Sequence, residues 1–376
     1  MNFSEVSQHK QDDSDDRTRI PKTFRLDEYQ YTLPSCLIAQ QPAPSRDSSR
    51  LLVLDRSKDK IEHCCFRDLP SLLLPSDLLV LNETRVVPTV MTGQKTTGGR
   101  VEILVLDPTD VSRKFQMTGQ AARECLVRSS KSLKQGSRII IQKNVELVAE
   151  EIVGKGRVRI RFPVSERDLP FFLDQWGRPP LPPYISRVGR DHSRDRVRYQ
   201  TVYARIPGSV AAPTAGLHFT QELLSKLATQ GVETVPIVLH VGPGTFVPVR
   251  DDDIRLHSME SEYYEIPDET ADALSKAYEA KRRIIAVGTT TVRTLESAAE
   301  GHGIFRVGPS MTALFITSGY DFRVVTGMVT NFHLPGSTLF MLVCAFAGTE
   351  RVKNAYEQAI RHGYRFYSYG DACLII

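Results

Sequence analysis

The feature that most constrains the fold of this chain is a change of pattern in its first half. Between Gly93 and Ser165, short runs rich in β-branched residues alternate with glycine turns. Successive short strands with little helix predict a small antiparallel barrel or sandwich. The flanking sequence instead alternates apolar strand-like runs with amphipathic helical stretches, which predicts an α/β body. The β-rich segment is therefore expected to be an insertion into that body.

The periodicity also predicts individual elements. In the insertion, strands are expected at 100–106, 137–142, 145–150 and 157–162. In the body, strands are expected at 77–81, 235–241, 284–287, 314–317 and 372–376. Helices are expected over 220–228 and 267–282, from Thr290 or Thr291, and from Ser337 and Glu350. The resulting division is a flexible tail (1–22), a discontinuous α/β body (23–92 and 166–376) and an inserted basic β-barrel domain (93–165).

The positive charge of the chain is concentrated in the insertion. The whole chain has a net charge of +4, whereas residues 93–165 contain 14 Lys and Arg against 7 Asp and Glu, which gives 14 − 7 = +7. The remainder therefore sums to 4 − 7 = −3. Arg157, Arg159 and Arg161 alternate with apolar residues, which places three guanidinium groups on one face of a strand. Such a module suits a phosphate backbone, and a merely solubilised surface is an equal alternative.

Several classes of protein are not expected from this composition. No run approaches the ~20 apolar residues of a membrane-spanning helix, and the N-terminus lacks the apolar core of a signal peptide. The six cysteines form no Cys-x-x-Cys pair and have no accompanying His-x₃₋₅-His spacing. We therefore expect a cytoplasmic protein with reduced thiols, no metal and no membrane contact.

Three loops have the composition of ligand-binding segments. Residues 198–220 contain small residues from Gly208 to Gly216 and then His218, although a well-packed turn would explain them too. Residues 240–246 (HVGPGTF) follow an apolar strand, where ligands of α/β proteins commonly bind. Residues 329–338 (VTNFHLPGST) offer Asn331 and His333 ahead of an apolar helix.

A fourth segment, Val287-Gly-Thr-Thr-Thr-Val-Arg293, is expected to form a strand end, a turn and a helix start. A helix N-terminus with hydroxyls and a cation suits a carboxylate or a phosphate. The alternative is an ordinary capped helix in which Arg293 pairs with Glu296 at i,i+3.

Taken together, these segments resemble one known family, the S-adenosylmethionine:tRNA ribosyltransferase-isomerases of queuosine biosynthesis. The resemblance covers essentially the whole chain after the tail, in order. It rests on the motifs LIAQ (37–40), RDSSRLLVLDR (46–56), DLLVLNETRVVP (77–88), PLPPYISR (180–187), GSVAAPTAGLHFT (208–220), LHVGPGTF (239–246), HSMESE (257–262), AVGTTTVRTLE (286–296), TNFHLPGSTLFMLVCAFAG (330–348) and YSYGDACLI (367–375).

The resemblance implies a mixed α/β barrel-like body with an inserted small antiparallel β-barrel. It also implies a reaction in which the ribosyl part of S-adenosylmethionine is transferred to 7-aminomethyl-7-deazaguanine at the tRNA wobble position. Adenine and methionine leave, and the product is epoxyqueuosine-tRNA. S-adenosylmethionine is then a co-substrate, tRNA is the partner, no metal is implied, and the enzyme is expected to be a monomer.

Site residues are assigned on this basis as hypotheses. His218 and His333 are the acid/base candidates because the proton transfers of the reaction favour groups that titrate near neutrality. Asp371 is expected to orient one of them or the substrate amine. Arg293 is expected to bind the methionine carboxylate through a charge-assisted pair. The adenosyl and methionyl parts are assigned to two small-residue loops containing Thr214, Ala215, Gly216, Gly242, Gly244 and Thr245.

Three other functions fit this sequence less well. An S-adenosylmethionine-dependent RNA methyltransferase would show an early strand, a GxGxG turn and a helix, which are missing from this sequence. A tRNA-guanine transglycosylase would show a zinc-binding Cys/His cluster. A non-enzymatic RNA-binding module fits the basic segment but leaves the loops of the body unexplained.

Overall fold

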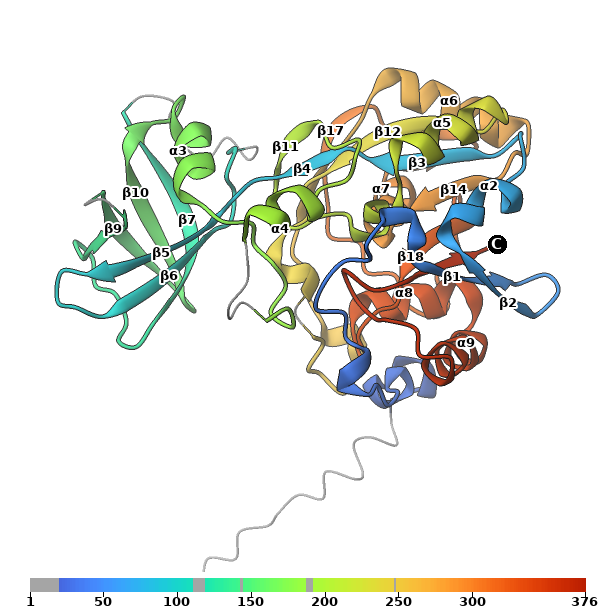
Figure 1. The fold of residues 1–376 in the computed structure, drawn as a ribbon, viewed down its shortest axis with the longest axis horizontal. Coiled ribbons are helices and arrows are strands. Elements are labelled where there is room, and N and C mark those ends of the chain that lie inside the picture. Colours follow the sequence, from blue (N-terminus) through green and yellow to red (C-terminus); the bar gives the residue numbers. More distant parts are fainter. Residues whose placement is uncertain (1–19, 111–118, 143–144, 187–191, 247) are drawn as a thin grey trace, which may run out of the picture.

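The protein has two parts, a small β-barrel and a larger α/β body, which lie side by side in Figure 1. The computed structural model describes residues 20–110, 119–142, 145–186, 192–246 and 248–376. Nearly all of the predicted tail (1–22) lies outside these residues. The chain leaves the body through β4 (Thr84–Val86), which pairs with β11 (Ile206–Ser209), and it returns after α3 (Leu169–Trp176).

The described residues of the body form a nine-stranded mixed sheet. Its order is β17-β13-β12-β3-β14-β18-β19-β1-β2, and β12, β3, β14 and β18 are parallel neighbours. The strands are β1 (Arg50–Asp55), β2 (Lys60–Cys65), β3 (Leu78–Asn82), β12 (Glu233–Leu239), β13 (Glu262–Ile266), β14 (Ile284–Val287), β17 (Gly308–Thr312), β18 (Gly327–Asn331) and β19 (Ala372–Ile375).

Helices cover both faces of this sheet. Successive side chains of a strand point to opposite faces, so the apolar side chains of each strand are buried against helices on both sides. Ile284 and Ala286 of β14 pack with the apolar residues of α6 (Asp268–Glu279), α7 (Thr289–Ala298), α8 (Thr338–Ala347) and α9 (Thr349–Arg361). Ile285 and Val287 pack on the other side with α2 (Leu69–Leu72) and α5 (Gln221–Thr229). Strands buried on both faces explain the nearly continuous apolar runs in the sequence.

The barrel is closed by six strands in the order β10-β7-β6-β5-β8-β9. They are β5 (Val90–Lys95), β6 (Arg100–Val105), β7 (Gln120–Ser129), β8 (Arg138–Ile140), β9 (Glu146–Gly154) and β10 (Arg157–Ser165). Val158, Ile160 and Phe162 of β10 point into the barrel core, while the alternating arginines do not. That core also contains Leu173 of α3 and Met91, so its packing extends beyond residues 93–165. The predicted boundaries of the inserted domain, Gly93 and Ser165, stay a prediction.

The expected mixed α/β body with an inserted antiparallel β-barrel is confirmed. The predicted strand at 284–287 has its expected bounds, and the Thr220 side chain caps α5 by accepting a hydrogen bond from the Leu223 N–H at 3.1 Å. The predicted strand at 314–317 is wrong: this segment is a loop, and the Leu314 N–H donates to the Thr312 hydroxyl instead of to a neighbouring strand. The expected N-cap at Thr290 or Thr291 is also wrong, because α7 begins at Thr289.

A buried ion pair fastens the barrel to the segment ahead of α3. Arg123 of β7 donates two hydrogen bonds to Glu166, at 2.9 and 2.6 Å, and the two side chains are 3% and 7% exposed. Removing one partner leaves a charge in a low-dielectric environment, which costs far more than the pair contributes as a whole.

We expect Glu166→Ala to lower the free energy of unfolding by about 3–5 kcal/mol, because Arg123 would keep a buried charge without its carboxylate. Glu357→Ala is the matched control, since Glu357 pairs with Arg361 on the surface of α9 and such pairs contribute about 0–1 kcal/mol. Urea unfolding monitored by circular dichroism measures both. Equal effects of the two substitutions would contradict the prediction.

Candidate active site

The motif loops meet at one edge of the body sheet. Because β12, β3, β14 and β18 are parallel, their carboxyl ends lie at the same edge. His240 directly follows β12, Gly288 follows β14 and Phe332 follows β18. Ligands of α/β proteins commonly bind at this edge. The edge is the candidate active site.

The larger of two cavities here lies between the body and the barrel. It has a volume of about 480 Å³ and is lined by the loop after β12, by residues 257–263 and by Leu106, Asp107 and Arg157 of the barrel side. We call it the main cavity. Its size lies within the range of about 300–1,000 Å³ found for small-molecule sites.

An imidazole and a phenol ring form one wall of the main cavity. His240 and Tyr263 are stacked, with ring centroids 5.3 Å apart and an angle of 18° between the planes. The Thr84 hydroxyl lies 2.8 Å from His240 Nδ1. Burial lowers the pKa of His240 from 6.5 to about 4, so its ring is neutral at pH 7. His240 belongs to the predicted ligand-binding loop 240–246.

A buried carboxylate connects the main cavity to α7. Glu262 accepts a hydrogen bond from the Gly242 N–H at 2.9 Å and forms an ion pair with Arg293. Arg293 also donates from Nε to the Leu314 carbonyl at 2.9 Å, while its Nη2 is buried without a hydrogen-bond partner. The alternative pairing of Arg293 with Glu296 is wrong. Glu296 instead accepts hydrogen bonds from the backbone N–H groups of residues 323–325.

An ion pair at the rim of the main cavity joins the barrel to the body. Arg157 of β10 donates to Glu260 at 2.5 Å and to Glu124 at 2.9 Å. Glu260 also lies against Gly244, where an added Cβ would be 2.7 Å from the Glu260 carboxylate. Arg157 of the predicted arginine row therefore reaches the loop assigned to the donor only through Glu260.

The second, smaller cavity is lined mostly by hydroxyl-bearing and small residues, and we call it the threonine pocket. Its volume is about 40 Å³. It brings together segments from all three predicted loops and the start of α7. The residues that line it are Ala212, Pro213, Thr214, Ala215, Val241, Gly288, Thr289, Thr290, Thr330, Asn331, His333 and Leu339.

His218 is buried beside this pocket with both ring nitrogens in hydrogen bonds. Asn331 Nδ2 lies 3.1 Å from His218 Nε2 and 3.3 Å from the Tyr367 carbonyl, while Asn331 Oδ1 accepts from the Thr214 hydroxyl. This arrangement makes Nε2 the acceptor, so Nδ1 carries the proton and donates to Ser49 at 2.7 Å. Burial lowers the pKa of His218 from 6.5 to about 4.

His333 is likewise buried and neutral. Its Nε2 lies 2.7 Å from the Thr330 hydroxyl, and burial lowers its pKa from 6.5 to about 3. Its backbone N–H donates to the Tyr356 hydroxyl at 3.1 Å, and its carbonyl accepts from the Tyr31 hydroxyl. The ring is therefore held on the wall of the threonine pocket by contacts of both backbone and side chain.

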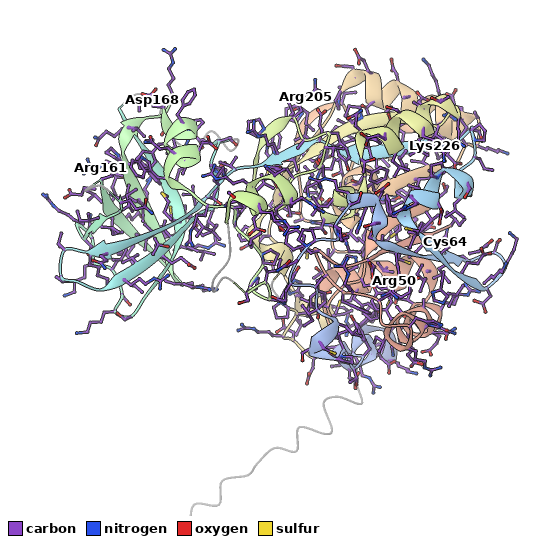
Figure 2. The ribbon with its side chains drawn as sticks, viewed as in Figure 1. Arg50, Cys64, Arg161, Asp168, Arg205 and Lys226 are labelled. Atoms are coloured by element: carbon purple, nitrogen blue, oxygen red, sulfur yellow. The ribbon has the colours of Figure 1, made fainter. Side chains whose placement is uncertain are left out.

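Asp371 has a different position from the one expected. Its carboxylate accepts from the Arg50 backbone N–H at 3.0 Å and the Arg365 backbone N–H at 2.8 Å, and it forms ion pairs with both arginine side chains. Arg50 lies on the body in Figure 2. Since both nitrogens of His218 are already bonded, the structure does not join Asp371 to that histidine by a hydrogen bond; its charge acts at longer range and favours protonation of His218.

The loop residues assigned to the donor divide between the cavities. Thr214 and Ala215 line the threonine pocket, and Gly242 and Gly244 line the main cavity. Gly216 lines neither cavity. Packing explains why this residue is a glycine, because an added Cβ would lie 2.1 Å from the Tyr203 hydroxyl. Thr245 belongs to η8 (Pro243–Phe246), and its side chain lies outside the described structure. Arg293 is also absent from the linings of both cavities.

Sequence reasoning missed three residues that the geometry brings into the site. Glu260 and Glu262 lie within the HSMESE motif that carried the family resemblance, but their paired positions in the cavity wall depend on tertiary contacts. Ser49 precedes β1 and reaches His218 across 169 residues of sequence. Nothing in a local pattern marks such a serine.

Metal and membrane features were examined over the same described residues. No group of three or more His, Cys, Asp or Glu side chains that could hold a metal ion occurs among them. None of the helices that the structure describes combines the length and apolar character of a transmembrane span.

Comparison with known proteins identifies the class of this fold and site. Residues 26–375 match the family model described as "Queuosine biosynthesis protein". An S-adenosylmethionine:tRNA ribosyltransferase-isomerase of Anaeromyxobacter sp. (strain Fw109-5) is 48% identical over 354 residues, which are 94% of this chain and 99% of that protein. The enzyme of the same name from Pelobacter propionicus is 49% identical, with 93% and 98% coverage.

A solved structure agrees with these relatives. The crystal structure of an S-adenosylmethionine tRNA ribosyltransferase from Thermotoga maritima matches with a TM-score of 0.51 at 35% identity, covering 93% of this chain and 100% of that one. The chain is an enzyme, and it belongs to the queuosine biosynthesis protein family. The family resemblance seen in the motifs is thus confirmed.

The buried histidines predict how stability depends on pH. The pKa of His218 is about 4 in the folded state against an ordinary value of 6.5, so the unfolded chain binds the proton first as the pH falls. The stabilising contribution of the neutral ring is therefore complete above pH 6.5 and is lost between pH 6.5 and about 4.

We expect His218→Gln to reduce the slope of unfolding free energy against pH by up to about 1.4 kcal/mol per pH unit in that window. His302→Asn is the control, since His302 is exposed at a turn with φ of 50°, which asparagine tolerates. Urea unfolding at a series of pH values measures the slope. An unchanged slope in His218→Gln would show that this ring is not neutral in the folded protein.

Proposed function

We propose that this enzyme transfers and isomerises the ribosyl part of S-adenosylmethionine onto 7-aminomethyl-7-deazaguanine at the wobble position of tRNA. The product is epoxyqueuosine-tRNA, and adenine and methionine are released. The observation that supports this most directly is the meeting of the family motifs around two adjoining cavities. Residues of HSMESE and LHVGPGTF line the main cavity, whereas residues of APTA, GTT and TNFH line the threonine pocket.

The charges of the main cavity fit the donor. S-adenosylmethionine carries a sulfonium cation and an ammonium group, and the precursor base carries an aminomethyl ammonium. Asp107, Glu260 and Glu262 line this cavity together with Arg157, so carboxylates outnumber cations in its lining by two, and Glu260 and Glu262 are already paired with Arg157 and Arg293. Carboxylates near a cation stabilise its charged form and bring it to the site. The His240–Tyr263 pair offers a flat apolar surface beside them.

The reaction requires three proton movements. The carbon beside the sulfonium loses a proton, the substrate ammonium loses one before its nitrogen bonds to the ribosyl carbon, and adenine gains one as it leaves. Burial lowers the pKa values of His218 and His333 to about 4 and about 3, so both rings are neutral near pH 7. A neutral imidazole cannot supply a proton to adenine, and the lowered pKa also makes it a weaker base than histidine in water, so neither ring titrates near neutrality as the sequence suggested. We propose His333 or His218 as the proton acceptor because of their positions at or beside the threonine pocket, and not as the acid that protonates adenine.

Positioning roles follow for two other predicted residues. Asp371 holds the start of β1 and the residues before β19 together through Arg50 and Arg365. Its proposed role is to fix the backbone beside His218. Arg293 holds Glu262 at the main cavity, so we propose that it acts through this carboxylate and does not contact the donor itself.

The tRNA contact on the barrel also needs revision in its details. Arg157, Arg159 and Arg161 are each paired with glutamates, so the arginine row is largely neutralised. Figure 2 shows Arg161 on the barrel, away from the body. Another set of cations has no carboxylate partner among the described residues. These tip cations are Lys95, Arg100, Lys131 and Lys134.

The tip cations gather at one end of the barrel. Lys95 and Arg100 flank the β5–β6 turn, which lies at the end farthest from the body (Figure 1). The Lys95 ammonium donates to the Lys131 carbonyl, which places the segment after β7 beside that turn. Unpaired cations release counterions when they bind phosphates, whereas paired ones must first lose a carboxylate. We propose the tip cations as the barrel's contact to the tRNA backbone.

We expect the double variant Lys95→Ala/Lys131→Ala to lower the slope of log K against log[salt] for tRNA binding by up to about 2, since each lost phosphate contact removes about 0.7–0.9. The matched control, Arg159→Ala/Arg161→Ala, removes the same charge from paired positions and should change the slope less. Filter binding at several salt concentrations measures both. The opposite ranking would show that the arginine row is the contact.

The reaction itself is tested with donor labelled separately in the ribose and in the methyl group, and with tRNA carrying the aminomethyl-deazaguanine. We expect ribose label in the tRNA and free adenine and methionine in solution. His333→Gln should lower kcat by about 10²-fold or more if this ring accepts a proton in the reaction. Methyl label in the tRNA would instead mean methyl transfer, and tRNA binding without adenine release would mean a binding protein.

A further inference from the structure

The start of α7 is an uncapped helix N-terminus at the carboxyl edge of the sheet. None of the side chains that the structure describes caps this ten-residue helix. The cap position is Gly288, which has no side-chain oxygen to offer. Its φ of +94° is strained for residues with side chains, which explains the glycine. The N–H of Val292 is the first to reach a carbonyl of the same helix, at 3.2 Å. The preceding N–H groups and the helix dipole therefore leave partial positive charge here.

A buried hydroxyl at the same place lacks a partner. Thr290 is 6% exposed, and its Oγ1 forms no hydrogen bond within the described structure. The neighbouring hydroxyls differ: Thr291 donates to the Val287 carbonyl at 2.7 Å, and Thr294 donates to the Thr290 carbonyl at 3.1 Å. Buried polar atoms are nearly always paired, so an unpaired one that lines a cavity indicates a missing oxygen or nitrogen.

The threonine pocket that Thr290 lines has the size of one small polar group. Its volume of about 40 Å³ corresponds to roughly three times the minimum for one water molecule. Val241 lines both this pocket and the main cavity, so the two are neighbours. A ligand in the main cavity could therefore extend one group into the pocket.

The two cavities differ in charge. The main cavity is lined by three carboxylates and one cation, Arg157, so negative charge is in excess there, whereas the residues that line the threonine pocket include no Asp, Glu, Lys or Arg. The guanidinium of Arg293, one turn further along α7 from Thr289, pairs with Glu262 and lines neither cavity, so the positive charge at the threonine pocket comes from the helix N-terminus itself. A zwitterionic ligand with separated charges fits this pair of cavities, with its cations in the main cavity and its anion in the pocket.

We infer that the threonine pocket is an anion site, in which the Thr290 hydroxyl and the first N–H groups of α7 bind an anionic oxygen group. That group is either the carboxylate of the donor's methionine half or a phosphate. The carboxylate assignment rests on the proposed function, and the phosphate assignment does not. The site takes the role that the sequence gave to Arg293.

The test compares the full-length protein with Thr290→Val, which keeps the shape of the side chain and removes the hydroxyl. Calorimetric titrations use S-adenosylmethionine, its decarboxylated analogue and inorganic phosphate. We expect the wild type to prefer the carboxylated donor, and Thr290→Val to lose about 10-fold or more of that preference, because a hydrogen bond to a charged group is lost. Thr294→Val is the control, since Thr294 lies one turn along the same helix and lines neither cavity.

The variant should fold, because it removes a hydroxyl that has no partner, and its melting temperature should equal or exceed that of the wild type. A lower phosphate affinity in Thr290→Val, with an unchanged preference for the carboxylated donor, would support the anion site with phosphate as its ligand. If neither quantity changes relative to Thr294→Val, the inference is wrong. A wild type that binds no donor would contradict the proposed function alone, and the phosphate titration would still decide on the anion site.

Discussion

The parallel pairing of β12, β3, β14 and β18 is the constraint on which the rest of the structure depends. Backbone hydrogen bonds fix these four strands in one direction, so four loops that are far apart in sequence begin at a single edge. β1 and β19 run in the opposite direction, and their first residues lie at that same edge. The site is thus assembled from loop ends and strand starts of one sheet, and its composition follows from topology.

Polar side chains buried at this edge determine its shape. Glu262 is held by Gly242 and Arg293, Asn331 by Thr214 and Tyr367, and Asp371 by Arg50 and Arg365. Each of these groups would be costly to bury alone, and its partners come from other elements. The histidines respond to the same burial by losing their charge. His218, His240 and His333 are therefore neutral near pH 7, and carboxylates outnumber cations in the lining of the main cavity.

The barrel contributes charge and one wall of the main cavity but has a core of its own. Its positive charge is not uniform. On β10 the arginines are matched by glutamates, and Arg157 reaches Glu260 of the body. At the β5–β6 end the cations lack such partners among the described residues. One segment therefore combines a neutralised face that contacts the body with a charged end that is open to a polyanion.

The sequence by itself determined the class of the fold, the insertion, most strands and helices and the family, because periodicity, turn residues and long motifs are local signals. It also predicted His333, Thr214 and Gly242 as site residues, and these line the two cavities of the candidate site. It could not determine that Tyr203 leaves room only for glycine at position 216, or that Arg293 pairs with Glu262 and not with Glu296. Nor could it determine that segment 314–317 is a loop. The reach of Ser49 to His218 and the lowered pKa values of the histidines were likewise decided only by the tertiary structure. Hydrogen-bond partners and burial arise from residues distant in sequence, and no local pattern records them.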